Sequence, residues 1–160
     1  MKKIILALIA LTLILSLAAC GGSKIKDDVA VSALAEKVGE KVSNLPNMMA
    51  AEDNYLQNLM LLEAGVSAEH VVMVNTAGKI AAEFGIFKGS DKANTEKIAK
   101  EVENYLARLD SEMAAMYIPE ELPKLRGAEV KIVGNYVIYA VLDEAEKAEV
   151  FKVFEAELGA

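Results

Sequence analysis

The apolar segment at the start of the chain decides how much of the sequence is left to form a domain. Residues 1–3 (Met-Lys-Lys) are a short basic start, and an almost unbroken apolar run follows from Ile4 to Leu17. A basic start, an apolar run and small residues at its end are typical of a secretory signal. The run is shorter than the roughly 20 residues that a membrane-spanning helix needs. We therefore expect residues 1–19 to be removed rather than to remain as a transmembrane helix.

The residues at the end of this segment, Leu-Ala-Ala-Cys at 17–20, resemble the lipobox of bacterial lipoproteins. The resemblance implies that the thiol of Cys20 receives a diacylglyceryl group and that the signal is then cut between Ala19 and Cys20. A thiolate is the most nucleophilic side chain near neutral pH, which suits this attachment. Two acyl chains hold a protein stably where one chain would exchange. We expect an extracytoplasmic protein, anchored by lipid (palmitate or a similar acyl chain) to the outer face of the cell membrane.

The cysteine count and the charge exclude several kinds of site. Cys20 is the only cysteine, so its lipidation would leave no disulfide, no cysteine metal ligand and no cysteine nucleophile. The formal net charge is -7, and it becomes more negative when Lys2 and Lys3 leave with the signal. An acidic domain repels phosphate backbones, so we expect no nucleic-acid partner.

The rest of the chain is long enough for one domain with its own core. The run Gly-Gly-Ser-Lys-Ile-Lys after Cys20 is typical of a short, flexible tether. We expect a signal at residues 1–19, a lipidated cysteine and tether at 20–27, and a single domain at 28–160.

Apolar residues at helical spacing predict four helices in this domain. We expect Asp27 or Asp28 to cap the first helix, which ends before Asn44–Asn47. The second covers Ala51–Glu63, the third is the longest, and the fourth follows Asp143. The inward-facing positions are, in chain order, Val31, Leu34, Val38 and Val42; Leu56, Leu59 and Met60; Ile98, Val102, Tyr105, Leu109, Met113 and Met116; and Ala148, Phe151, Phe154 and Leu158.

A two-residue alternation of apolar and other residues predicts two hairpins. In the first, Val71–Val74 pairs with Ile80–Phe87. In the second, Glu129–Ile132 is followed by a turn at Gly134–Asn135, where glycine accepts a positive φ, and then by Tyr136–Leu142. We expect an α+β fold in the order α-α-β-β-α-β-β-α, with an antiparallel sheet of two hairpins and helices mainly on one face.

Glu83 lies among apolar residues in one of these strands. On a sheet with one open face it would point to water, which is our expectation. The other interpretation buries it beside a partner such as Lys131. The tyrosines do not cluster in the sequence and give no support to a sugar-binding platform; they are Tyr55, Tyr105, Tyr117, Tyr136 and Tyr139.

Three blocks of the domain resemble a known family. They are Ala82–Lys88 (Ala-Glu-Phe-Gly-Ile-Phe-Lys), Pro119–Leu125 (Pro-Glu-Glu-Leu-Pro-Lys-Leu) and Val133–Val137 (Val-Gly-Asn-Tyr-Val). The family is the domain of unknown function 4358 family of Gram-positive, clostridial-type lipoproteins. The resemblance covers Val29 to the end and implies a lipid-anchored, extracytoplasmic protein. It carries no activity and no catalytic residues.

Residues suited to catalysis or metal binding are few. His70 is the only histidine, and a Ser-His-Asp site or a zinc site would need it. No nucleophile-elbow motif accompanies it, so we expect a surface histidine. Met113 and Met116 stand one helical turn apart and could hold Cu(I), but both also continue an apolar stripe, so we expect them in the core or at an interface. We expect no metal and no cofactor.

The segment between two prolines, residues 119–124, is a candidate contact surface. Glu120 and Glu121 are adjacent and point to opposite sides, which weakens the case for a shared carboxylate site. A rigid exposed segment loses little entropy when it binds. We therefore expect a partner surface made of Pro119, Glu120, Glu121, Pro123 and Lys124.

These observations favour a non-enzymatic binding module that recognises another envelope protein, either through an open sheet face or through the segment at 119–124. The alternative is a small-molecule or metal-binding lipoprotein that serves a membrane transporter. A hydrolase that uses carboxylates alone stays open as a third class.

Overall fold

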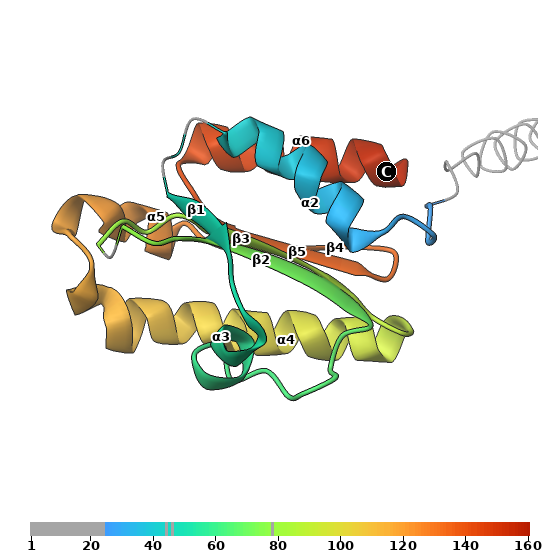
Figure 1. Ribbon diagram of the computed structural model, residues 1–160, viewed down its shortest axis with the longest axis horizontal. Coiled ribbons are helices and arrows are strands. Elements are labelled where there is room, and N and C mark those ends of the chain that lie inside the picture. Colours follow the sequence, from blue (N-terminus) through green and yellow to red (C-terminus); the bar gives the residue numbers. More distant parts are fainter. Residues whose placement is uncertain (1–24, 44, 46, 78) are drawn as a thin grey trace, which may run out of the picture.

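Five antiparallel strands form one sheet in the computed structural model, which describes residues 25–160 except 44, 46 and 78 (Figure 1). Their spatial order is β1-β2-β3-β5-β4. The hairpins β2–β3 and β4–β5 confirm both predicted hairpins, and β3 pairs with β5 at the centre of the sheet. Gly134 has the positive φ expected at the second turn. The strands are β1 (Met48–Ala50), β2 (Glu69–Asn75), β3 (Glu83–Lys88), β4 (Glu129–Val133) and β5 (Tyr136–Val141).

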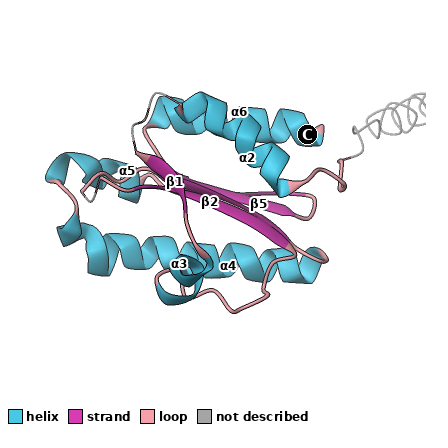
Figure 2. Cartoon of the chain, in the orientation of Figure 1, coloured by secondary structure: helices cyan, strands magenta, loops and turns pink. Residues whose placement is uncertain are grey.

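Helices cover both faces of this sheet (Figure 2). On one face lie α2 (Val31–Gly39), which continues as a 3-10 turn, and α6 (Glu144–Leu158). On the other lie α4 (Lys92–Arg108) and the short α3 (Asp53–Asn58). The α+β class and the order of the predicted elements are confirmed, but the expectation of helices mainly on one face is wrong. The central strands β3 and β5 are buried at almost every position, and a strand that is apolar on both sides needs a cover on each.

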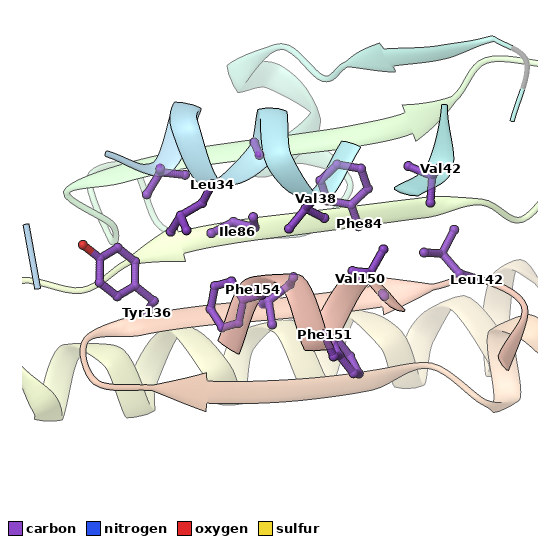
Figure 3. Close-up of a cluster of buried hydrophobic side chains, with 14 of the residues drawn as sticks. Leu34, Val38, Val42, Phe84, Ile86, Tyr136, Leu142, Val150, Phe151 and Phe154 are labelled. Carbon is purple, nitrogen blue, oxygen red and sulfur yellow. The ribbon is translucent and has the colours of Figure 1, made fainter. Parts of the chain in front are cut away.

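The core on the α2–α6 side is aliphatic and aromatic (Figure 3). Leu34 and Val38 of α2 and Phe154 of α6 are fully buried against Phe84 and Ile86 of β3. Burying one such side chain contributes about 1.5–3 kcal/mol. This layer therefore fixes β3 in place, and β3 carries Glu83 on its other face.

The first helix is capped by a distant residue rather than by Asp27 or Asp28. Helix α2 begins at Val31, and its first N–H donates to Glu69 of β2 at 2.9 Å. Asp27 instead accepts from the side-chain amide of Asn135 at 3.0 Å. In the part of the predicted tether that the structure describes, residues 25–27, the backbone N–H of Lys26 also donates to Leu158. These contacts hold the entry of the chain against the end of the domain that carries the β4–β5 turn.

The region after α2 departs from the prediction. Directly after the predicted break, β1 adds an edge strand beside β2, and the predicted helix Ala51–Glu63 is reduced to α3. The backbone N–H of Ala51 donates to Val72, so pairing with β2 competes with helix formation at this point. Leu61 adopts a positive φ, which a continuous helix excludes.

The longest helix also ends earlier than expected. After α4 the chain forms a π-helical turn at Leu109–Met113 and a 3-10 turn at Ala114–Met116. The π-helical turn shifts the phase of the apolar stripe, so Met116 is 58% exposed instead of buried.

The segment at 119–124 is also helical: a 3-10 turn at Pro119–Glu121 leads into α5 (Leu122–Arg126).

Candidate functional site

Glu83 is the first residue of β3, and its side chain lies on the face that α4 covers. It pairs with Val74 of β2 and Val141 of β5 and is 5% exposed. The expectation that the carboxyl group faces water is therefore wrong. The other interpretation, burial beside a partner, is confirmed, but the partner is not Lys131, which pairs with Glu155 at 2.7 Å. The physical reason is the second helical layer, which closes the face that we expected to be open.

Two phenols bind the same carboxyl oxygen. Tyr55 of α3 and Tyr105 of α4 each donate to Oε2 of Glu83 at 3.0 Å. The two hydroxyl oxygens also lie 2.8 Å from each other. These three oxygens form a triangle whose three contacts need three protons, and the phenols supply two. A proton on Oε2 would complete the set, with one phenol accepting it, the other donating to Oε2 and the first donating to the second, so the geometry fits a neutral Glu83.

The electrostatics of the cluster point the same way. Burial raises the pKa of Glu83, while hydrogen bonds from Tyr105 and Tyr55 and the nearby hydroxyl of Tyr139 favour its ionised form. Burial also raises the pKa of each phenol, to about 12 for Tyr117. The tyrosines therefore stay protonated near neutral pH and act as hydrogen-bond donors, and no Lys or Arg among the described residues is paired with Glu83.

The second oxygen of the carboxyl group has no well-formed hydrogen bond. Oε1 of Glu83 and the hydroxyl of Tyr139 are both buried, and neither makes a hydrogen bond of acceptable geometry to any described residue. The Tyr139 ring lies over Gly85, where an added Cβ would overlap it, and meets the Tyr105 ring edge-on at 6.1 Å between centroids. Gly85 thus makes room for the aromatic wall beside Glu83. Buried polar groups without partners are rare in folded proteins and call for an explanation.

Glu83 forms part of the wall of a cavity of about 170 Å³ at the end of the sheet. Tyr55 and Tyr117 also line it. Met116 lines it as well and is exposed to solvent. The rest of the lining is mainly aliphatic: Leu59, Val74, Ile80, Ala81, Ala82, Leu125 and Val141, with Asn75 as a further polar residue. The cavity therefore combines one carboxyl group, aromatic rings and apolar surface.

The predicted partner surface helps to build this wall. Glu121 is 8% exposed; its Oε2 accepts from the backbone N–H of Ala81 at 3.1 Å and pairs with Lys124 at 3.0 Å. The expectation that Glu121 and Lys124 present themselves to a partner is wrong, because they hold the 3-10 turn against the start of β3. Pro119, Glu120 and Pro123 are exposed as expected.

His70 lies beside a smaller hollow, away from Glu83. Its Nδ1 lies 3.1 Å from Oγ of Ser67, and its Nε2 lies 3.5 Å from Asp53. The residue types are those of a hydrolytic triad, but the Asp53 side chain is 88% exposed, whereas a triad needs a buried carboxylate that orients the imidazole. We interpret the group as a surface hydrogen-bond cluster, in line with the expectation of a surface histidine.

Metal ligands, membrane-spanning helices, the methionine pair and the lipidation site were also considered from the sequence. Within the described ranges no group of three His, Cys, Asp or Glu side chains is placed to hold a metal ion, and no helix there is long and apolar enough to cross a membrane. Met116 lines the Glu83 cavity, while the Met113 side chain is outside what the structure describes. Ala19 and Cys20 also lie outside the described residues.

The comparisons agree with the resemblance drawn from the sequence. No curated protein and no solved structure matches the chain. A family model described as Domain of unknown function (DUF4358) matches residues 40–142, which include Glu83 and the tyrosines around it. The match spans more than half of the chain, and the protein therefore belongs to the domain of unknown function 4358 family.

Proposed function

We propose that this protein is a lipid-anchored, extracytoplasmic binding protein, not an enzyme, whose site is the Glu83 cavity. The observation that supports this most is a buried carboxyl group that lines a cavity and is paired with no lysine or arginine of the described chain. A fold gains no stability from such a group, because desolvation of a polar group costs free energy that only a partner restores. A ligand would be that partner.

The cavity favours a small ligand over a protein surface. Helices cover both faces of the sheet, so the described residues leave no open sheet face, which was one of the two partner surfaces considered from the sequence. A volume of about 170 Å³ is close to that of a cavity that admits a benzene-sized molecule. We therefore favour the small-molecule form of the alternative from the sequence, a lipoprotein that binds a small molecule and serves a membrane transporter.

The position of the cavity suits a protein anchored at its N-terminus. The chain enters the domain at Lys26, beside Leu158 and the turn that carries Asn135. Glu83 lies at the opposite end of β3, whose six residues span about 20 Å. In Figure 1 the entry point and the α5 end of the domain accordingly lie on opposite sides. A lipid on Cys20 would leave the cavity facing away from the bilayer.

Thermal unfolding of the full-length protein in a non-ionic detergent tests the binding site. A ligand at a hundredfold over its Kd stabilises by about 2.7 kcal/mol, which raises the melting temperature of a chain this size by several degrees. A panel of small molecules is compared on the wild type, on Leu59→Trp, which fills the cavity, and on Ile132→Trp on the exposed edge strand. We expect a saturable shift that Leu59→Trp abolishes and Ile132→Trp retains. A shift that survives Leu59→Trp, or the absence of any shift, would contradict the proposed site.

Anchoring is tested separately in cells. Wild type should incorporate labelled palmitate and sediment with membranes, whereas Cys20→Ser should lose the label and leave the membrane fraction. Equal labelling of the two proteins would contradict attachment at Cys20.

A further inference from the structure

The chemistry of the Glu83 cavity identifies the class of its ligand. We propose that the cavity binds a compact organic cation, an ammonium or guanidinium group, which becomes the counter-ion of Glu83. This inference rests on the function proposed above, because it takes the same cavity to be the binding site.

No lysine or arginine of the described chain is paired with Glu83. Lys124 pairs with Glu121 and Asp143, and Arg108 donates to the backbone carbonyls of Leu59 and Met60. A buried carboxyl group is ordinarily paired with a cation or kept neutral. Since the described chain supplies no cation at Glu83, we infer that a bound ligand supplies the positive charge.

A carboxyl group and aromatic rings line the same cavity. Tyr55 and Tyr105 hold Oε2 of Glu83 and therefore keep the carboxyl group oriented in the cavity wall. Tyr55 and Tyr117 line the same cavity, and aromatic rings attract cations within about 6 Å of the ring centre. A carboxylate beside aromatic side chains is the donor set that recognises an organic ammonium.

The size and polarity of the cavity suit a compact cation with a small apolar part. Its volume of about 170 Å³ admits only a few non-hydrogen atoms, and its aliphatic wall, which includes Val74 and Val141, suits methyl groups or a short carbon stem. The formal net charge of -7 repels anions and attracts cations toward the protein. A bare metal ion fits poorly, because Glu83 is the only carboxylate among the lining residues.

Binding is coupled to the loss of one proton. The titratable groups that face Glu83 are Tyr55 from α3, Tyr105 from α4 and Tyr139 from β5, with Tyr117 across the cavity; Glu121 is paired with Lys124. The phenols keep their protons, so Glu83 is the group that ionises when the cation enters. Cation affinity should then rise by up to about tenfold per pH unit while the empty site is protonated.

The cation can be a free small molecule or the Lys or Arg side chain of a partner protein. Calorimetric titration of the full-length protein in a non-ionic detergent separates the effect of the ligand's charge from that of its shape. It also distinguishes a free small molecule from an amino-acid side chain. Guanidinium is compared with urea, tetramethylammonium with tert-butanol, and both cations with the N-acetyl amides of lysine and arginine. We expect saturable binding of cations, at least about tenfold weaker binding of the neutral counterparts, and about one proton released per cation in buffers of different ionisation enthalpy.

Two variants complete the test. Glu83→Gln keeps the shape and removes the charge, and should weaken cation binding by about 30-fold or more, while Glu63→Gln, at the exposed hollow near His70, should leave it unchanged. Neutral and charged probes could bind equally well, with binding abolished by Leu59→Trp and unaffected by Glu83→Gln. This result would contradict a cationic ligand but would still support the proposed site. Failure of every cation to bind would also contradict a cationic ligand. Binding of the amino-acid amides alone would support the cation and assign it to a partner's side chain.

Discussion

Replacing Glu83 by glutamine should change how the stability of the protein depends on pH. Glutamine has nearly the same shape and stays neutral, and its carbonyl oxygen can still accept from Tyr55 and Tyr105. In the wild type, burial raises the pKa of Glu83 above its ordinary value of 4.5. Between 4.5 and the raised value, the folded protein therefore binds more protons than the unfolded chain.

The sign of the effect follows from this difference. The neutral Glu83 contributes its full stability below pH 4.5, and the contribution is lost as the pH rises toward the folded pKa. One proton corresponds to about 1.4 kcal/mol of unfolding free energy per pH unit. The glutamine variant has no such loss, so its stability relative to the wild type should increase by up to this amount per unit above pH 4.5.

Urea unfolding at a series of pH values between 4.5 and neutrality measures this directly. All other titrating groups are common to both proteins, so the difference between the two curves isolates Glu83. Glu63→Gln removes a carboxyl group that is 69% exposed and should give a curve parallel to that of the wild type. If Glu83→Gln is also parallel to the wild type, the argument that Glu83 is buried and neutral is refuted.

Four further substitutions test the packing and capping of the fold, each by urea unfolding at constant pH. Gly85→Ala should destabilise by about 1–3 kcal/mol because its Cβ would overlap the buried Tyr139 ring, whereas Gly39→Ala, whose nearest neighbour lies at 4.0 Å, should stabilise by up to about 1 kcal/mol; equal effects would contradict the packing. Glu69→Ala should cost about 1 kcal/mol by removing the cap of α2, and no loss would show that the cap is unimportant. Lys147→Ala should cost about 1–2 kcal/mol because this nearly buried lysine donates to a carbonyl and pairs with two carboxylates that are themselves exposed, and no loss would contradict its role.

Local patterns in the sequence predict much of the fold. The turn at Gly134–Asn135 and the alternation beside it identify the second hairpin, and the apolar stripe from Ile98 identifies α4. The strand β1 escapes prediction because it exists only through pairing with β2, a contact that three residues cannot reveal on their own. The sequence did contain evidence that both faces of the sheet are covered. Tyr136–Val141 is an unbroken run of apolar residues, which is typical of a strand enclosed on both sides, and the structure buries all of them.

The candidate site was predictable only in part. Glu83 is conspicuous in the sequence as a charge within an apolar strand, but its partners come from separate elements, Tyr55 from α3, Tyr105 from α4 and Tyr139 from β5. Spacing along the chain carries no information about such a convergence. Tyr105 was expected in the core because it falls on an apolar stripe, and only the tertiary structure directs its hydroxyl to a carboxyl group.

In the function proposed here, the Glu83 carboxyl group is the ligand-binding group of the cavity that it lines. Carbon-13 NMR of the full-length protein labelled at glutamate carboxyl carbons tests it most directly, with the Glu83 signal assigned by its absence in Glu83→Gln. We predict a pKa for Glu83 above 4.5 in the empty protein and a fall in this pKa when saturating tetramethylammonium or guanidinium is added. A Glu83 signal that titrates at its ordinary value, and that neither cation moves, would contradict the account.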